Sequence, residues 1–448
     1  MVTTGAEVKK KRVVSGMRPT GRLHIGHYFG ALQNWVRLQN AASPHGKKEY
    51  ECFYFIADWH ALTSDYADTS EVAQNTIEIM TDYLAAGLDP QKSVLFQQSL
   101  VPEHAELHLL LSMVTPLGWL ERVPTYKEAL ENVKDKDLHN YGFLGYPVLQ
   151  CADIVIYSSP GEAGEEGAQL FVPVGEDQVS HVETSREIVR RFNLFNGLEL
   201  DEALRNVAYG ASFLGEMQSA LRIAPLHPGA DKFPLNDSDW GEVVSKFKGW
   251  LLEVGIENGL RTLKELGGWD RYVRVKKVLC EPDHKLTKTP RIPGLDGRKM
   301  SKSYGNAITL SESDADIRAK TKVMVTDPAR KRRTDPGNPD VCPVYDWHKL
   351  FSTKETLDWA AQGCRTAGIG CIECKAKMAD HLIEWITPVR ERRVEYERHP
   401  KKVMEILDEG SKKARVVAQA TMGRVREAVF GWEKKKKEID GSAGSAKA

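Results

Sequence analysis

Short apolar runs alternate with longer helical patterns over residues 12–193 of the chain. Four such runs are predicted to be strands: Val13–Val14, Cys52–Ala57, Val94–Phe96 and Phe171–Val174. Cys52–Ala57 is apolar almost throughout, as a strand covered on both faces should be. A helix is predicted between the second and third runs, ending before Gly87 and Pro90. The alternation predicts an α/β fold with a Rossmann-like, doubly wound parallel sheet. Polar residues that end its strands should line the crevice where open sheets bind ligands.

The pattern changes farther along the chain, which indicates several domains. The pattern of residues 194–277 predicts helices, but these residues contain no recognisable catalytic or binding motif. We interpret them as a helical insertion. Residues 278–313 return to the sheet domain, and residues 314–432 predict a second, more basic helical domain. The two ends, 1–11 and 433–448, are charged or rich in Gly, Ser and Ala, so we expect them to be disordered.

Composition and charge narrow the class of protein. Hydrophobic residues make up 41% of the chain and charged residues 28%, which excludes a wholly disordered or fibrous protein. The 62 basic side chains balance 62 acidic ones, so any site for a polyanion must be a local patch. No stretch approaches the ~20 apolar residues that cross a bilayer, and the first residues lack an apolar signal core. We therefore expect a cytoplasmic protein that contacts no membrane.

The first candidate for chemistry is the segment Ser15–His27, which follows a predicted strand and opens an amphipathic helix. Glycines let the backbone approach a ligand, and a helix N-terminus offers N–H groups to an anion. His24 and His27 are three residues apart and share one helix face. The segment predicts phosphate binding, although an isolated pair of this kind is more often a packed or exposed pair of histidines.

The second candidate is Gly297–Asn306, some 270 residues later. Its two lysines, Lys299 and Lys302, stand three residues apart among hydroxyl side chains, and glycines flank them. Such a mobile loop can bring positive charge onto a leaving phosphate. Taken alone, the segment is more often an ordinary surface loop.

Together the two segments resemble the class I aminoacyl-tRNA synthetases, whose signatures HIGH and KMSKS stand here at residues 24–27 and 299–303. The resemblance implies activation of an amino acid with ATP and Mg²⁺, followed by transfer to tRNA. It implies that five residues contact the phosphates of ATP: His24, Gly26, His27, Lys299 and Lys302. It also assigns the following residues to ATP: Arg18, Pro19, Thr20, Met300, Ser301 and Ser303. Positioning and charge stabilisation would carry the reaction, without a protein nucleophile.

Two further segments, Tyr146–Tyr157 and Val172–Gln178, resemble the tryptophanyl-tRNA synthetases. By this resemblance Asp153 accepts the indole N–H, and the pocket around it is formed by His60, Tyr146, Val172, Val174 and Gln178. An apolar slot with one fixed acceptor suits indole, which is flat and carries one donor. The resemblance also places Gly175, Glu176 and Asp177 at the ribose side of ATP. Without it, Asp153 would be read as a helix-face ion pair and His60 as a core histidine.

The resemblance covers most of 12–193 and 280–432. It implies a Rossmann catalytic domain in two parts, 12–193 and 278–313, and a tRNA anticodon-binding domain at 314–432. The expected partners are L-tryptophan, ATP, tRNA(Trp) and a second copy of the chain, but not DNA. The role of the insertion, at the acceptor arm of tRNA, at the second subunit or at neither, is left open.

Three other functions compete with this one. The related tyrosyl enzyme shares the fold and a similar Tyr-Pro-x-x-Gln segment, but it usually departs from Val172–Gln178. A nonenzymatic RNA-binding protein with a synthetase fold would not need the intact His24, His27, Lys299 and Lys302. A nucleotidyltransferase that adenylates another carboxylate would not depend on tRNA.

Four of the seven cysteines, Cys342, Cys364, Cys371 and Cys374, crowd into one region with gaps of 21, 6 and 2 residues. Four thiolates suit tetrahedral zinc or an iron–sulfur cluster. Some bacterial tryptophanyl enzymes carry a 4Fe-4S cluster on a similar pattern, whose first gap is one residue longer. Loop closure depends weakly on length, so we expect a 4Fe-4S cluster, with zinc as the alternative.

Basic residues near the cysteines and in the last helices are candidate tRNA contacts. They are Arg330, Lys331, Arg332, Arg333, Lys412, Lys413, Arg415, Arg424 and Arg426. A solvated helix face is the alternative interpretation of these charges.

Overall fold

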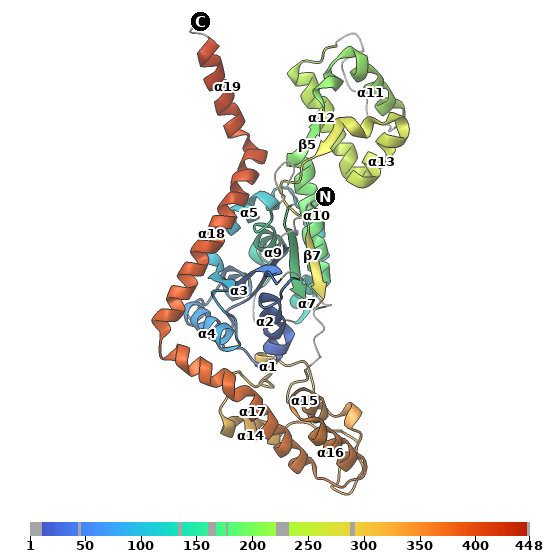
Figure 1. The fold of residues 1–448 in the computed structure, drawn as a ribbon. Coiled ribbons are helices and arrows are strands. Elements are labelled where there is room, and N and C mark those ends of the chain that lie inside the picture. The colour runs from blue at the N-terminus through green and yellow to red at the C-terminus, as the bar shows by residue number, and fades with distance from the viewer. Residues whose placement is uncertain are drawn as a thin grey trace, which may run out of the picture.

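The computed structural model describes residues 11–43, 46–132, 137–159, 167–175, 178–220, 233–286 and 292–445. Figure 1 shows a central sheet with covering helices, a helical lobe at each end, and one long helix running along the side. Among the described residues, no helix combines the length and the apolar character that a membrane span requires.

The central sheet is parallel throughout its described strands, in the order β3-β2-β1-β4-β7. The strands are β1 (Lys11–Met17), β2 (Tyr50–Ile56), β3 (Ser93–Gln97), β4 (Gln169–Val174) and β7 (Pro282–Leu286). The four predicted strands and the Rossmann-like topology are confirmed. The sequence did not predict β7, because an edge strand has one neighbour and needs no continuous apolar run.

Helices pack on both faces of the sheet, because side chains of a strand alternate between its faces. Val13 belongs to one apolar cluster and its neighbour Val14 to the other. The helices of this domain are α1 (Ile25–His27), α2 (Gln33–Gln39), α3 (Asp58–Asp65), α4 (Val72–Ala85), α5 (Glu103–Ser112), α6 (Leu117–Leu120), α7 (Pro124–Asn132), α8 (Tyr141–Leu144), α9 (Tyr146–Val155) and α10 (Val179–Gly197). A π-helical turn at Tyr28–Leu32 joins α1 to α2.

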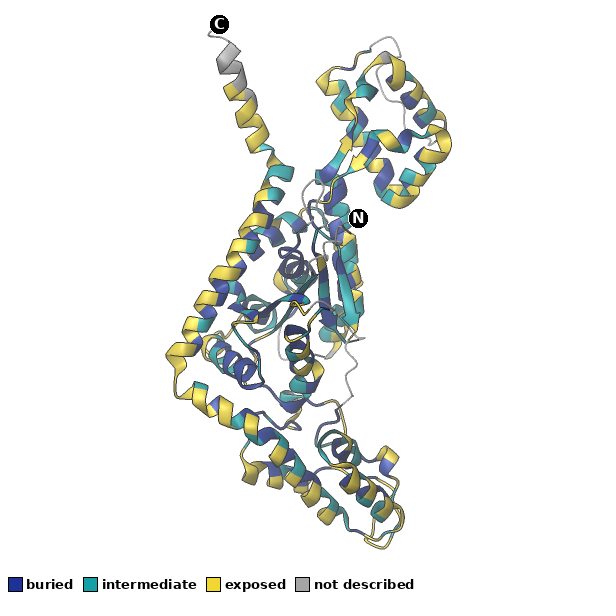
Figure 2. Cartoon of the chain, viewed as in Figure 1, coloured by how far each residue is buried: buried dark blue, intermediate teal, exposed yellow. Residues whose placement is uncertain are grey.

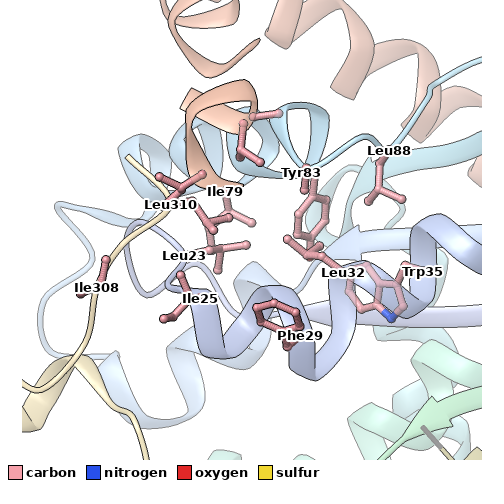
Figure 3. Packing of buried hydrophobic residues seen from close by; sticks show 14 of the residues in the cluster. Leu23, Ile25, Phe29, Leu32, Trp35, Ile79, Tyr83, Leu88, Ile308 and Leu310 are labelled. Carbon is pink, nitrogen blue, oxygen red and sulfur yellow. The ribbon is translucent and has the colours of Figure 1, made fainter. Parts of the chain in front are cut away.

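The first of these clusters contains side chains from distant parts of the chain. Figure 3 shows Leu23, Ile25 and Phe29 packed near Ile79 of α4 and near Ile308 and Leu310. All six are at most 6% exposed. The segment around residue 308 therefore completes the core of a domain that begins at residue 11.

The lobe at one end of the molecule is the predicted insertion (Figure 1). It contains α11 (Val207–Ala220), α12 (Asp237–Val254) and α13 (Ile256–Gly267). Two short antiparallel strands, β5 (Leu198–Leu200) and β6 (Val273–Val275), stand at its base. Its apolar residues, among them Phe213, Phe247 and Trp269, form a cluster separate from the two at the sheet.

The C-terminal helices are α14 (Asp314–Lys322), α15 (Pro343–Phe351), α16 (Lys354–Arg365), α17 (Cys371–Glu397), α18 (Pro400–Phe430) and α19 (Trp432–Ser445). The sequence analysis grouped α18 with the basic helical domain, but α18 packs along the sheet domain (Figure 1). It covers the edge strand β3, where the Ser411 hydroxyl accepts the N–H of Gln97 at 3.2 Å. An uncovered edge strand would leave such groups unpaired.

The described residues reach into both ends of the chain, for which the sequence predicts disorder. Lys11 is the first residue of β1, while residues 1–10 lie outside the described residues. At the other end, α19 continues beyond Gly431 to Ser445, and its described side chains, which reach to Asp440, are exposed (Figure 2). Its lysines and glutamates are good helix formers, and Lys436 pairs with Glu433 at 2.7 Å one turn away.

Gly410 lets α18 approach β3 closely, which provides a test of this packing. A Cβ atom at Gly410 would lie 1.7 Å from the Leu95 carbonyl oxygen, whereas one at Gly423 of the same helix would meet nothing within 4 Å. We predict that Gly410→Ala lowers the free energy of unfolding by about 1–3 kcal/mol. Gly423→Ala, the control, should leave it unchanged or raise it by about 0.5–1 kcal/mol. Urea unfolding midpoints measure both, and equal midpoints for the two variants would contradict the packing.

Candidate active site

The two signature segments meet in space. The Ile25 N–H donates to the Ile308 carbonyl at 3.0 Å, and the Leu310 N–H donates to the Leu23 carbonyl at 2.8 Å. In the second segment, the Lys302 ammonium donates to the carbonyl oxygens of Thr20 and Gly21, at 2.5 and 3.0 Å. The predicted juxtaposition of HIGH and KMSKS is therefore present, with Lys302 against the turn that precedes His24.

His24 and His27 form a stacked pair, with ring centroids 3.6 Å apart. Nδ1 of His24 accepts the His27 N–H at 3.3 Å, and Nδ1 of His27 accepts the His24 N–H at 3.2 Å. A neutral imidazole that accepts at Nδ1 carries its proton on Nε2. Both histidines therefore present an Nε2–H donor, as a site for phosphate oxygens requires.

Burial and the nearby lysine keep both rings uncharged. Burial is the main reason that the pKa of His24 falls to about 4, and the Lys302 ammonium contributes. Burial, His24 and Lys302 together hold the pKa of His27 well below its usual range. Positive charge at this site therefore comes from Lys302 rather than from the histidines.

Asn306 organises the KMSKS loop from within. It is 3% exposed, and its amide oxygen accepts the Ser301 N–H at 2.8 Å. Its amide nitrogen donates to Asp296 at 2.7 Å and to the Lys299 carbonyl at 3.1 Å. The sequence analysis did not single out Asn306, because an Asn beside a glycine is an ordinary turn signal.

The remaining predicted ATP residues take different positions. Met300 is buried against the first core cluster and lies close to Gly26, while Lys299 is exposed. Arg18 and Thr20 are exposed and Pro19 is buried. The side chain of Ser303, and Glu176 and Asp177 altogether, lie outside the described residues.

A buried ion-pair network supports the HIGH turn from the other side. The Asp82 carboxylate of α4 accepts the Leu23 N–H at 2.7 Å and pairs with Arg393 of α17, which also pairs with Glu78. Asp82 is fully buried and Arg393 is 1% exposed. Burial raises the pKa of Asp82 to about 6, although Arg393 opposes the rise. No sequence motif indicated this network, since its members come from separate helices.

A cavity of about 710 Å³ lies beside the carboxyl ends of β1, β2 and β4. All six predicted pocket residues line it: His60, Tyr146, Asp153, Val172, Val174 and Gln178. Arg18 and Gly175 line it as well. Because Arg18 precedes the turn that Lys302 contacts, the cavity adjoins the HIGH and KMSKS segments.

Asp153 is the buried anion of this cavity. Its carboxylate accepts hydrogen bonds from His60 at 2.9 Å, from His104 at 2.6 Å and from Gln98 at 2.7 Å. Burial alone would raise its pKa, but the bonds and charges of His104 and His60 outweigh burial and hold the pKa at about 2. The carboxylate is therefore ionised at neutral pH. Gln98 and His104 were missed, although Gln98 directly follows a strand, which is the signal used for the other sites.

A second group of polar side chains lines the cavity near Tyr146. The Thr125 hydroxyl bonds to the Tyr146 hydroxyl and lies 3.1 Å from Nε2 of His181. Burial raises the pKa of Tyr146, so its hydroxyl stays protonated at neutral pH. Thr125 and His181 carry no motif, and only the fold brings them to the cavity.

The four clustered cysteines come from three helices and lie near one another. Cys342 precedes α15, Cys364 lies in α16, and Cys371 and Cys374 begin α17. Burial raises the pKa of Cys374 to about 12, and the other three cysteines add to the rise. Among the described residues, however, no group of three or more His, Cys, Asp or Glu side chains has the arrangement of a metal site.

Several basic residues that were predicted to contact tRNA instead bond to other residues of the chain. Arg330 is 8% exposed and donates to the Ile369 carbonyl at 2.6 Å. Three arginines attach α18 to the sheet domain: Arg415 to Glu103, Arg424 to the Ser158 carbonyl and Arg426 to Glu106. Lys331, Arg332 and Lys413 are exposed, as a phosphate contact requires.

Comparisons with known proteins agree with this geometry. The family described as tRNA synthetases class I (W and Y) matches residues 7–207 and 267–386, which leaves most of the insertion outside. A tryptophan–tRNA ligase of Ralstonia nicotianae is 47% identical over 423 residues, which cover 94% of this chain and 98% of that protein. A second tryptophan–tRNA ligase, from Aquifex aeolicus, is 38% identical, and the match covers 93% of this chain and 99% of that protein.

Among solved structures, a tryptophanyl-tRNA synthetase from Campylobacter jejuni, complexed with ADP and tryptophan, matches with a TM-score of 0.64. It is 27% identical, and the match covers 93% of this chain and 99% of that one. The family match spans well over half of the chain, and the identities with the relatives hold over nearly its full length. The chain therefore belongs to the class I tRNA synthetases of the tryptophan and tyrosine family and, within it, to the tryptophan–tRNA ligases.

Proposed function

We propose that the chain activates L-tryptophan with ATP to give tryptophanyl-adenylate and pyrophosphate, and then transfers tryptophan to the 3′ end of tRNA(Trp). One observation carries the proposal. The HIGH and KMSKS segments meet beside a cavity whose buried anion is Asp153. An ATP-binding half and an indole-sized half with one fixed acceptor are the two parts that this reaction needs.

The activation step requires positioning and charge rather than a protein nucleophile. A carboxylate oxygen of tryptophan attacks the α-phosphorus of ATP, a new P–O bond forms, and the bond to the departing pyrophosphate breaks. The Nε2–H groups of His24 and His27 donate to phosphate oxygens, and Mg²⁺ accompanies the nucleotide. Lys302, together with the exposed Lys299, stabilises the charge that develops on pyrophosphate. The turn at Arg18, Pro19 and Thr20 covers the phosphates.

Asp153 selects the side chain of the amino acid. Its Oδ2 accepts the bond from His60, which lines the cavity, so an indole N–H can approach the same oxygen. Val172 and Val174 provide apolar walls, while Tyr146 and Gln178 supply polar groups for the backbone of the substrate. An amino acid without a matching donor could not replace the bond that His60 makes to Oδ2, and displacing that bond without replacing it costs ~1–3 kcal/mol.

We predict amino-acid-dependent exchange of pyrophosphate into ATP with tryptophan and not with tyrosine. Asp153→Ala should reduce tryptophan-dependent exchange by at least about 100-fold, because the indole loses its acceptor and three donors lose their partner. ATP binding should persist, since Asp153 bonds to His60, His104 and Gln98, and none of these is assigned to ATP. Exchange kinetics and ATP titration measure the two effects.

The outcomes separate the competing functions. Exchange with tyrosine alone would identify a tyrosyl enzyme, and no exchange with any amino acid would favour a nonenzymatic RNA-binding protein. Exchange with another carboxylate and no aminoacylation of tRNA would indicate a nucleotidyltransferase. Near-normal exchange by Asp153→Ala would remove Asp153 from its assigned role.

The uncharged state of His24 predicts a pH dependence of stability. Because its pKa of about 4 in the folded chain is below the ordinary value of 6.5, the unfolded chain takes up a proton first as the pH falls. This contribution to the free energy of unfolding is present above pH 6.5 and is lost between about pH 6.5 and pH 4, by up to about 3 kcal/mol. His24→Asn keeps the acceptor at the Nδ1 position and does not titrate, so it should lose less stability from pH 7 to pH 5.

Urea unfolding at the two pH values measures this difference. His399→Asn is the control, because the His399 side chain is 58% exposed and should leave the wild-type pH profile intact. Identical losses for wild type and His24→Asn would show that His24 is not the group responsible.

We further propose that Cys342, Cys364, Cys371 and Cys374 hold a 4Fe-4S cluster, with Zn²⁺ as the alternative. Four cysteine thiols supply the soft donor set that both groups require. Thiols that raise one another's pKa are stabilised as thiolates by a metal. The cluster would join the loop before α15 to the end of α16 and to the first turn of α17.

Metal analysis of anaerobically purified protein tests this assignment. We expect about four iron atoms with acid-labile sulfide per chain and a brown chromophore. Cys374→Ser should lose both, whereas Cys280→Ala, which changes a cysteine outside the group, should keep them. Stoichiometric zinc without a chromophore would establish the alternative.

The remaining proposals concern partners and domains. We assign residues 314 to about 397 to the anticodon-binding region, with Lys331 and Arg332 as phosphate contacts. We propose a homodimer, because Leu109, Met113 and Leu117 are exposed apolar side chains on neighbouring parts of α5 and α6. The enzyme would act in the cytoplasm, where tRNA is charged.

A further inference from the structure

Asp153 receives hydrogen bonds from three separate elements. His60 of α3 donates to Oδ2 at 2.9 Å, and His104 of α5 donates to Oδ1 at 2.6 Å. Gln98, in the turn after β3, donates to both oxygens at 2.7 Å. A carboxylate has about four acceptor positions, so these bonds account for all of them.

The three donors are not equivalent in position. His60 lines the cavity, whereas Gln98 and His104 are fully buried and do not line it. His104 and Gln98 therefore hold the carboxylate from behind. His60 holds the oxygen that faces the cavity, and a substrate can replace its bond.

A second layer of bonds orients these two buried donors. The Trp59 N–H donates to Oε1 of Gln98 at 3.0 Å, so the amide nitrogen of Gln98 faces Asp153. The Tyr157 hydroxyl lies 2.8 Å from Nε2 of His104. Because the Asp153 carboxylate can only accept, Nδ1 of His104 carries a proton, while Nε2 forms a hydrogen bond with the Tyr157 hydroxyl. Tyr157 is fully buried too.

We infer that His104, oriented by the Tyr157 hydroxyl, is a positioning residue that sets the selectivity of the enzyme for a ring bearing an N–H group. It keeps the Asp153 carboxylate ionised and turned so that Oδ2 accepts the indole N–H in place of His60. This inference rests on the proposed activation of tryptophan. It assigns a specificity function to two residues that a substrate in the cavity does not touch.

The physical reason is the cost of a mobile or protonated Asp153. A buried carboxylate that loses a donor either keeps an incompletely solvated charge or takes up a proton. When protonated, it is a weaker acceptor for the indole N–H; when ionised but no longer held by His104, it can turn Oδ2 away from the cavity. A hydrogen bond to a charged group contributes enough that its loss reduces selectivity by about 10-fold or more.

A pair of substrates isolates this effect from general damage to the fold. L-tryptophan carries the N–H, and L-β-(3-benzothienyl)alanine has sulfur in its place with nearly the same ring shape. Pyrophosphate exchange gives kcat/KM for each. We expect His104→Ala to lower the ratio of kcat/KM for tryptophan over the analogue by about 10-fold or more, with a smaller loss for the analogue itself.

Conservative variants sharpen the test. His104→Asn places an amide donor near the position of Nδ1, so it should retain more of the ratio than His104→Gln, whose amide reaches the position of Nε2. Tyr157→Phe removes only the orienting hydroxyl and should lower the ratio by a smaller factor. Tyr83→Phe is the matched control, because it removes an equally buried hydroxyl that donates to the Phe55 carbonyl at 3.3 Å on the other face of the sheet. Its ratio should equal that of wild type.

Each outcome decides the inference. A lowered ratio in His104→Ala, partly restored in His104→Asn, supports it. Equal losses for both substrates would assign His104 to structural stability alone and overturn the inference, as would an unchanged ratio in folded His104→Asn, His104→Gln and Tyr157→Phe. Failure of the proposed function is distinguishable, because wild-type enzyme would then show no exchange with tryptophan.

Discussion

The backbone pairing between residues 23–25 and 308–310 is the constraint on which the site depends. Two hydrogen bonds join segments almost 300 residues apart, and apolar side chains from both segments share one core cluster (Figure 3). The pairing holds the HIGH turn against the rest of the sheet domain and fixes the C-terminal end of the KMSKS loop beside it. Lys302 then reaches the carbonyl oxygens of Thr20 and Gly21 with little freedom left in the chain. Because the intervening insertion forms its own core, it does not disturb this pairing.

Charge is distributed unequally over the two halves of the site. The half proposed to bind phosphates has uncharged histidines and a lysine as its cation, so the approach of a polyanion would not require the histidines to change protonation state. The half proposed to bind indole has one buried anion with its donors already in place. Hydrogen bonds within the chain hold the groups of both halves in place, so little reorganisation is needed during the reaction.

The C-terminal helices complete the catalytic domain as well as extending it. Arg393 of α17 pairs with Asp82 and Glu78, and Asp82 in turn accepts the Leu23 N–H. Removing one partner of a buried pair of this kind would leave an uncompensated charge. Farther along, α18 covers the edge of β3 and approaches it closely at Gly410. The helices beyond residue 370 therefore support the strand ends and the HIGH turn through direct contacts.

The sequence by itself determined the parallel sheet and the two signature segments, because local patterns encode strands, helix starts and short motifs. It indicated the six residues around the cavity only through its resemblance to a known family. It did not predict β7, the helix α19 or the packing of α18 along the sheet. Tertiary structure alone decided which separate side chains meet: Gln98 and His104 at Asp153, Arg393 at Asp82, and Asn306 inside its loop. The groups that meet at Asp153 and at Asp82 lie far apart along the chain and have no spacing in common. Their role follows from burial, since a charged or polar group removed from water requires a partner wherever the fold supplies one.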